Sequence, residues 1–410
     1  MATLRPFRAL RPTTARAAAV ASVPYDVVNA AEARALADGN PLSFLRVSRA
    51  EIELPPDLDP YSDEVYAHAA ANYARLTGQA FELDSSPSLY LYRLRMGEHE
   101  QTGIAACFSI DEYDNDVIKK HERTRRDKED DRTRHMLAVG AQTGPVFLTY
   151  RASADVNDLV RRLVTAAPLI DFAAVDGVQH TLWRVDGADR DALVAAFTRI
   201  PSLYIADGHH RAASAARART TLRDAGSTRP SLGDAADYNY VLAVAFPHDA
   251  VHILPYNRVV KDLAGMSTDG FLSALDDRFV VAPGTPTPDT AGHVSMYLAG
   301  VWFSLTPKTP PPADDVIASL DVSVLQEQLL SPILNIVDVR TDKRIDFVGG
   351  IRGTDELERI VDSGHAAVAF SLYPVSVADL MAVSDSQAIM PPKSTWFEPK
   401  LRDGLLLHVI

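Results

Sequence analysis

The chain has 410 residues, 47% hydrophobic and 23% charged, which is typical of a soluble globular protein long enough for two domains. A net charge of -13 disfavours a broad nucleic-acid-binding surface, and one cysteine, Cys107, excludes an internal disulfide and a multi-cysteine zinc site. No apolar stretch reaches the roughly 18 to 20 residues of a membrane span, and the N-terminus lacks a signal-peptide core. We expect a cytoplasmic protein.

Hydrophobic periodicity predicts mixed helices and strands over the first 260 residues. Helices are expected at 30–40, 62–76, 156–167 and 190–200. Strands are expected at 86–96, 102–110, 144–150, 180–186 and 203–206, with two more within 238–260. In the charged segment 117–144, Glu122 with Arg126 and Asp130 with Arg134 have the i,i+4 spacing of ion pairs on a solvated helix.

A second domain is expected from residue 261. Its Pro/Gly/Thr-rich run at 280–292 predicts a loop, followed by a strand pair within 295–307, a helix at 321–334 and a strand at 365–375. The alternation predicts an α/β protein with helices and strands mixed (α+β), divided into domains 1–260 and 261–410.

The stretch LYIADGHHRAASAARA, which begins at Leu203, predicts a strand, a tight turn and a helix. Asp207 is a favoured helix N-cap, and Gly208 permits a tight backbone path. The first N–H groups of a helix lack internal partners and lie at the positive end of its dipole, so they attract an anion. The alternative is that Asp207 is only an N-cap and Gly208 only a turn residue.

His209, His210 and Arg211 fall in the first turn of that helix. Arg211 adds forked donors suited to phosphate, and the histidines can donate hydrogen bonds or exchange protons near neutral pH. Replacing Arg211 should then weaken anion binding without unfolding the protein. Adjacent helical side chains point roughly 100° apart, so no metal site is expected from a direct His/Cys cluster. The alternative is a packed histidine pair.

Seven ordered stretches resemble those of domain-of-unknown-function family 1015, a family of prokaryotic proteins. They are RPFRALRP, SVPYDVV, NPLSFLRVSRAEIELP, IKKHERTRRDKEDDRTRH, YIADGHHRAASA, ILPYNRVV and MPPKSTWFEPKL. The ADGHHR box and the later LPYNR are also similar to the ParB/sulfiredoxin-like superfamily, which includes free-serine kinases. This second resemblance implies a ParB-like element at about residues 190–260.

In those kinases the box handles phosphate, a carboxylate activates the serine hydroxyl, and Mg²⁺ helps to carry phosphate charge. The resemblance implies that the two histidines, Gly208 and Arg211 hold phosphoryl oxygens and that Asp207 positions a metal or a hydroxyl. Arg258 of LPYNR would be a second phosphate clamp, or else an exposed arginine at a strand end. The kinases often carry histidine where this chain has Asn257, which puts an acid–base role there in doubt.

Two carboxylates are candidates for the base, Asp26 in VPYDVV and Glu51 in SRAEIELP. The alternatives are that Asp26 caps a helix and that Glu51 lies on a solvated edge. Lys393 is a further candidate for phosphate contact, although the glycine pattern of a P-loop is missing. The charged segment adds second-tier candidates at its start, namely His121, Glu122, Arg125 and Asp127.

The resemblance implies a phosphotransferase-type enzyme at the level of serine and O-phosphoserine, working as a serine kinase or as a phosphoserine phosphatase. Its partners would be a small-molecule substrate, Mg²⁺, and a nucleotide or pyrophosphate as donor, and a homodimer is left open. The alternative is a non-catalytic ParB-like module that binds a CTP-type nucleotide or associates with nucleic acid. Sulfiredoxin chemistry is excluded because no cysteine lies near the box.

Overall fold

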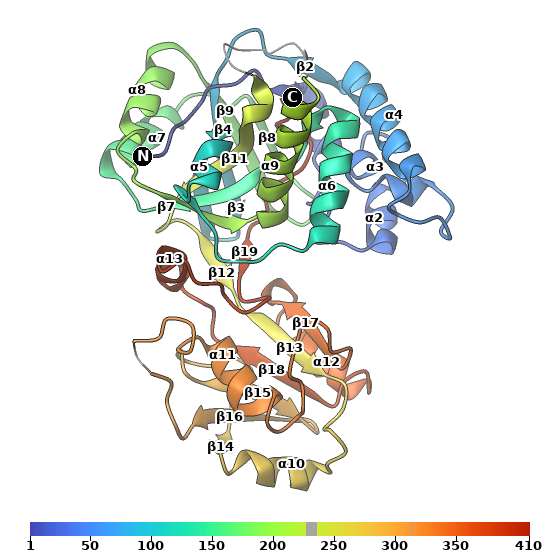
Figure 1. Ribbon diagram of the computed structural model, residues 1–410, viewed down its shortest axis with the longest axis vertical. Helices are drawn as coiled ribbons and strands as arrows, with labels where there is room; N and C mark the ends of the chain where they lie inside the picture. The colour runs from blue at the N-terminus through green and yellow to red at the C-terminus, as the bar shows by residue number, and fades with distance from the viewer. Residues whose placement is uncertain (227–235, 313) are drawn as a thin grey trace. The chain divides into compact units, whose positions relative to one another are not determined.

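The computed structural model describes residues 1–226, 236–312 and 314–410, which divide into two compact units (Figure 1). Unit 1 comprises Met1–Val251 and Pro399–Ile410, and unit 2 comprises His252–Glu398. The boundary therefore lies before residue 252 rather than after residue 260. The reason is that strand β13 (Tyr256–Val260) pairs with strands of unit 2. The ParB-like element expected at 190–260 accordingly crosses the boundary.

Unit 1 is built on a mixed eight-stranded sheet in the order β5-β10-β7-β11-β4-β3-β9-β8. β5 and β10 are parallel, as are β7 and β11, and the other neighbours are antiparallel. The strands are β3 (Leu89–Met96), β4 (His99–Ser109), β5 (Ile118–Lys119), β7 (Val146–Tyr150), β8 (Ile170–Ala173), β9 (Gln179–Val185), β10 (Leu203–Asp207) and β11 (Tyr240–Pro247). Two small sheets pair β1 (Leu10–Pro12) with β2 (Phe81–Leu83), and β6 (Ala141–Gln142) with β20 (His408–Val409).

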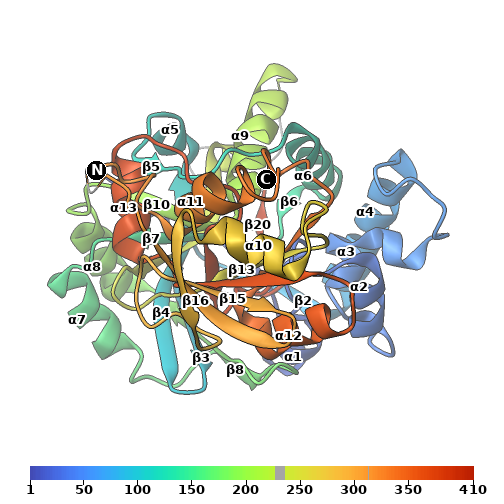
Figure 2. The ribbon, with the colours of Figure 1, turned by 90° about the horizontal axis from the view of Figure 1, so that it is seen from below.

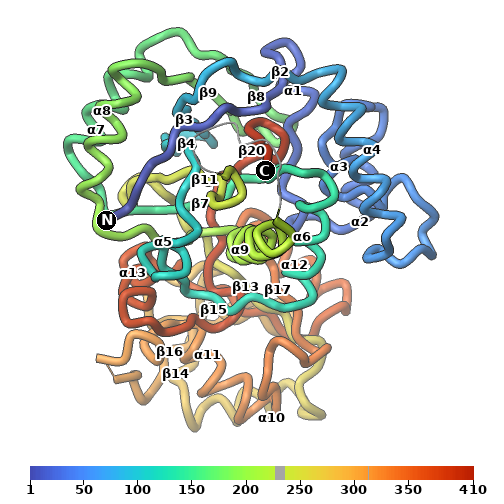
Figure 3. The backbone as a smooth tube through the Cα atoms, turned by 45° about the horizontal axis from the view of Figure 1, so that its top comes forward, coloured from blue at the N-terminus to red at the C-terminus, as the bar shows by residue number. Residues whose placement is uncertain are grey.

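The helices of unit 1 are α1 (Ala17–Val20), α2 (Ala30–Ala37), α3 (Leu45–Ser48), α4 (Asp63–Ala80), α5 (Ile110–Asp114), α6 (Arg126–Val139), α7 (Ala154–Leu163), α8 (Gly187–Phe197) and α9 (His209–Asp224). They pack in more than one cluster: residues of α5 to α9 belong to the core of this sheet, whereas α1 to α4 pack largely in separate clusters. The small apolar side chains of α9 pack in the main core with residues of β4, and α9 lies beside α6 (Figure 3). Among the described residues, every helix is too short or too polar to cross the bilayer.

The charged segment 117–144 differs from its predicted form. It begins as the short strand β5 and becomes helical only at Arg126, so Glu122 lies outside the helix. Asp130 pairs with Arg217 of α9, and Arg134 pairs with Asp63 of α4. The predicted i,i+4 pairs are therefore wrong, because neighbouring helices offer these side chains partners across the packing interface.

Unit 2 has a fully antiparallel six-stranded sheet in the order β14-β16-β15-β18-β13-β17, and β15 and β16 run side by side in Figure 2. The strands of unit 2 are β12 (His252–Leu254), β13, β14 (Phe279–Pro283), β15 (Val294–Leu298), β16 (Val301–Pro307), β17 (Ile345–Gly349), β18 (Val368–Leu372) and β19 (Trp396–Glu398). Of these, β12 and β19 pair with each other in a separate two-stranded sheet. Its helices are α10 (Thr268–Leu275), α11 (Asp321–Leu325), α12 (Asp355–Asp362) and α13 (Val377–Asp385). In the register, buried Met296 of β15 lies opposite Phe303 and Phe370, which joins three strands in one apolar core.

Three sequence predictions need correction. The run 280–292 is not all loop, because it begins within β14. The helix expected at 321–334 is α11 followed by a π-helical turn, Gln326–Leu330. Residues 238–260 hold three strands rather than two, since Pro255 separates β12 from β13. The mixture of helices and strands itself is as predicted.

Candidate functional site

The ADGHHR box lies where several strand ends of unit 1 meet. Because β5 and β10 are parallel, His121 just after β5 and Asp207 at the end of β10 emerge at the same edge of the sheet. β7 runs antiparallel to β10, so Gly144 and Pro145, which precede β7, lie at this edge as well. This edge is also where α9 begins.

Gly208 makes the turn from β10 into α9. It has left-handed backbone angles, φ 92° and ψ 30°, and it is the N-cap residue of α9. The prediction that Asp207 caps the helix is therefore wrong, because Asp207 is still the last residue of the strand. A Cβ at Gly208 would lie 3.0 Å from Nε of Arg211, so the Arg211 side chain folds back against the turn.

Gly208→Ala should lower the free energy of unfolding by about 1–3 kcal/mol, because a side chain is strained at this φ and would press on Arg211. Urea unfolding would measure the change. Gly39→Ala is the matched control, since Gly39 has φ 65° but no atom within 4 Å of its added Cβ. Equal losses in the two variants would mean that the contact with Arg211 contributes nothing.

Arg211 is a buried side chain bound to protein acceptors. It is 8% exposed, and it donates to Oδ2 of Asp207 at 2.8 Å and to the carbonyl of Pro145. Burial lowers the pKa of Arg211, but the carboxylates of Asp26, Asp207 and Asp403 outweigh burial and raise it above its ordinary value. Its charge therefore holds three carboxylates around the box.

The box histidines differ in environment. His209 is buried, and its ring packs edge-on against that of His121 with 4.4 Å between centroids. Burial lowers the pKa of His121 to about 4 and that of His209 well below its usual range, so both are neutral at pH 7. His210 is only half-buried, and its Nε2 accepts a hydrogen bond from the backbone N–H of Arg125 at 3.0 Å. This bond leaves the ring proton of neutral His210 on Nδ1.

The second-tier candidates gather at the same place. The backbone N–H of His121 lies 3.4 Å from Nε2 of His209, and Oε2 of Glu122 lies 3.8 Å from Nδ1 of the same ring. Arg125 contacts the box through its backbone, whereas its side chain pairs with Asp127 on the surface at 2.7 Å. Three of the four candidates thus reach a box histidine directly.

Asp207 has a second cationic neighbour. Nζ of Lys400 lies 3.8 Å from Oδ1 of Asp207, and Lys400 belongs to the closing segment of unit 1. Sequence reasoning missed Lys400, although it is the last lysine of the quoted stretch MPPKSTWFEPKL. Asp403, three residues further on, was missed as well.

Asp26 is an exposed residue of the loop before α2. Asn29, not Asp26, caps α2, and its capping box with Glu32 is complete. The helix-cap alternative for Asp26 is therefore wrong, and its charge instead acts on Arg211. Glu51 pairs with Arg49 at 2.7 Å. Arg49 in turn donates to the backbone carbonyls of Tyr25 and Val28, so Glu51 helps to stabilise the loop that contains Asp26.

Arg258 and Lys393 come together in unit 2. Arg258 lies within β13 and is 2% exposed, so the alternative of an exposed strand-end arginine is wrong. It donates to the carbonyl of Lys393 at 3.0 Å and to that of Tyr256, and burial lowers its pKa to about 9. Asn257 is structural here, since its Oδ1 accepts from the backbone N–H of Leu372.

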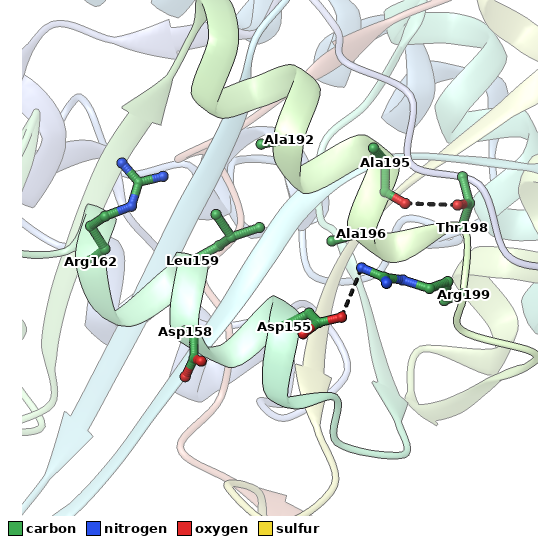
Figure 4. A pocket seen from close by; sticks show the side chains of 9 residues that line it. All are labelled: Asp155, Asp158, Leu159, Arg162, Ala192, Ala195, Ala196, Thr198 and Arg199. Atoms are coloured by element: carbon green, nitrogen blue, oxygen red, sulfur yellow. Dashed lines mark hydrogen bonds and ion pairs between the residues drawn. The ribbon is translucent and has the colours of Figure 1, made fainter.

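Two hollows are found among the described residues of unit 1, one at the surface and one near the box. A broad surface groove lies between α7 and α8 (Figure 4), and there Arg199 pairs with Asp155 at 2.8 Å. A smaller pocket of about 40 Å³ lies against the box, and Tyr25, Arg132, Arg211 and Asp403 are among its lining residues. Of these two hollows, the second is the one whose described lining includes a box residue, Arg211. Among the described residues, no group of three or more His, Cys, Asp or Glu is arranged to hold a metal.

The chain belongs to the family described as "Protein of unknown function (DUF1015)", whose model matches residues 4–323. No curated protein matches the chain.

Solved structures with similarity to the chain include three that share 12–14% sequence identity with it. A conserved hypothetical protein from Pyrococcus furiosus is 14% identical, with a TM-score of 0.36 over 74% of this chain and 94% of that chain. A free serine kinase in complex with AMP is 12% identical, with a TM-score of 0.36 over 73% and 91% of the two chains. SbnI with a C-terminal truncation, from Staphylococcus aureus, is 12% identical, with a TM-score of 0.36 over 73% and 85%.

Proposed function

We propose that the protein is a phosphotransferase-type enzyme acting at the level of serine and O-phosphoserine, with the ADGHHR box as its phosphate-handling element. The observation that carries the proposal is the convergence of Asp207, His210 and Lys400 at the amino end of α9. Phosphoryl transfer needs mainly positioning and positive charge around the phosphoryl oxygens, together with a group that orients the acceptor hydroxyl. This edge of the sheet offers both.

The roles follow from the environment of each residue. The amino end of the 16-residue helix α9 and Lys400 would hold the phosphoryl oxygens. His210 would donate from Nδ1 to the bridging or leaving oxygen, and Asp207, held by Arg211, would orient the acceptor hydroxyl. The buried pair of His209 and His121 would position the turn. The choice of serine as acceptor rests on the resemblance of the box and of LPYNR to free-serine kinases.

Mg²⁺ would arrive with the phosphate rather than occupy a preformed cage. Mg²⁺ is commonly held by one or two carboxylates together with substrate phosphates, and it neutralises phosphate charge. Asp207 and Asp26, both close enough to act on the charge of Arg211, are the carboxylates that would contribute oxygen ligands.

A phosphorus NMR time course with Mg²⁺ tests the proposal. One set of samples holds serine with ATP, ADP or pyrophosphate, and another holds O-phosphoserine alone. Formation of phosphoserine would identify a kinase and its donor, and release of free phosphate would identify a phosphatase. If no sample changes, the proposal fails, and nucleotide binding without turnover would then favour the non-catalytic module.

His210→Ala should lower kcat by about 100-fold or more while leaving KM within a few-fold, because it removes a proton donor used mainly in the transition state. Initial rates from the active sample of the NMR series would measure this. Asp127→Asn is the matched control, because Asp127 lies two residues after Arg125, whose backbone contacts His210, while its own side chain pairs with the Arg125 side chain on the surface. A His210→Ala variant with the wild-type kcat would remove His210 from the chemistry.

A further inference from the structure

The pocket beside the box is small and mainly enclosed by protein. It lies between α6, α9 and the segment that precedes β7, and its volume of about 40 Å³ has room for about three water-sized groups. Gly144 forms part of its wall, and a Cβ there would lie 2.2 Å from Oδ1 of Asp403. The backbone at Gly144 therefore leaves space for the Asp403 carboxylate at the pocket.

Asp403 is a buried carboxylate without a close cation. It is 3% exposed, and it forms no ion pair within 4 Å with any residue that the structure describes. A hydrogen bond from the backbone N–H of Tyr25 and the more distant charges of Arg211 and Arg132 stabilise its ionised form. A buried ionised carboxylate is costly unless it is paired, so this site favours a cation.

The other charged groups on the pocket already have partners. Arg211 is bound to Asp207 at 2.8 Å, and Arg132 is bound to Asp131 at 2.8 Å while lying over the Tyr25 ring at 4.1 Å. Each arginine is thus in direct contact with a carboxylate other than Asp403, although both act on Asp403 from a greater distance. Among the charged residues that line the pocket, Asp403 is the one without a direct ion pair, so it is the candidate to pair with a charged ligand.

We propose that this pocket binds the primary ammonium group of the acceptor, with the Asp403 carboxylate as its partner. An ammonium is the size of a water molecule, and the pocket accommodates it with the carbon that carries it. A hydroxyl acceptor without an ammonium would leave Asp403 unpaired, so the pocket distinguishes serine from hydroxy acids. The identity of serine rests on the proposed function, whereas the preference for an ammonium rests on the pocket alone.

The pairing predicts how affinity depends on pH. Only ionised Asp403 pairs with an ammonium. Burial raises the pKa of this carboxyl and the charge of Arg211 lowers it, and the resulting pKa is about 7. Binding should therefore strengthen between pH 5.5 and 8. The titratable and charged groups that face Asp403 are Arg211 from α9, Arg132 and His135 from α6, and Tyr25 and Asp26 from the loop before α2. His135, with a pKa of about 4, stays neutral over this range.

The test is calorimetric titration of the full chain at pH 8 with three probes: L-serine, glycerate and ethanolamine. Glycerate carries a hydroxyl in place of the ammonium, and ethanolamine keeps the ammonium and hydroxyl but lacks the carboxylate. We expect serine and ethanolamine to bind and glycerate to bind at least 30-fold more weakly than serine. Asp403→Asn should weaken serine binding by about 30-fold or more, whereas the exposed Asp189→Asn should leave it unchanged.

Several results would overturn the inference. They are glycerate binding as tightly as serine, no binding by either amine, or a folded Asp403→Asn variant that keeps wild-type serine affinity. The comparison of serine with glycerate uses the unaltered protein, so it stands even if the variant does not fold. Amine binding that depends on Asp403 without any phosphoryl transfer would refute the proposed function alone. Phosphorylation of serine that is unaffected by Asp403→Asn would refute the pocket assignment alone.

Discussion

The Asp403→Asn variant is expected to be more stable than the wild type at pH 8 by about 2–4 kcal/mol and equally stable near pH 4. Burial is the main cause that raises the pKa of Asp403 from 3.8 to about 7 in the folded protein. Because the folded-state pKa is the higher one, the stabilising contribution is complete below pH 4 and is lost as the pH rises through 7. Each pKa unit corresponds to about 1.4 kcal/mol, and asparagine avoids the loss.

Urea unfolding at intervals from pH 4 to pH 8 would measure this difference. Asp176→Asn is an informative control, because Arg402 outweighs burial and lowers the pKa of Asp176, so its contribution to stability is present at neutral pH. That variant should be less stable than the wild type at pH 8. A difference between Asp403→Asn and the wild type that stays constant over this range would contradict the expectation. If Asp403→Asn gains stability but loses amine binding, Asp403 behaves like a residue that is retained for function at a cost in stability.

Arg211→Ala is expected to lower the free energy of unfolding by about 3–5 kcal/mol, the range found when one member of a buried charge pair is removed. The loss leaves Asp207 without its 2.8 Å partner and removes the positive charge that offsets Asp26 and Asp403. The sequence interpretation, in which Arg211 could be replaced without harm to the fold, neglects this burial. Urea unfolding at pH 7.5 would measure the loss.

Arg217→Ala is the matched control within the same helix. Arg217 also pairs with carboxylates, Glu129 and Asp130, but its side chain is 37% exposed. Exposed ion pairs typically contribute less than about 1 kcal/mol, so this variant should remain close to wild type. If Arg211→Ala were as mild as Arg217→Ala, the structural role assigned to the Arg211 side chain would be wrong.

The local form of the box could be predicted from the sequence. An apolar run before Asp207, a glycine, and an alanine-rich run after it specify a strand, a turn and a helix by propensity alone. The α4, β3 and β7 elements are similar cases, since their hydrophobic periods match their structures. The charged segment 117–144 was harder, because the i,i+4 spacing of charges does not distinguish pairs within a helix from pairs to its neighbours.

The composition of the site could not be predicted in the same way. His121 meets His209 because β5 lies beside β10, an arrangement that depends on sheet order rather than on either segment. Lys400 and Asp403 reach the box because the closing segment of the chain returns to unit 1, where Ser22 and Asp403 form an isolated bridge. No spacing in the sequence carries this information.

The sequence by itself determined the mixed α/β class, the strand–turn–helix that carries the box, and the family to which the chain belongs. These depend on local propensity and on ordered stretches of residues. Only the tertiary structure decided that Arg211 is buried and bound to protein acceptors and that His210 is more accessible than His209. It also decided that Asp403 lies at a pocket without a direct ion pair. Burial and charge pairing depend on residues distant in the chain, and folding alone brings those residues together.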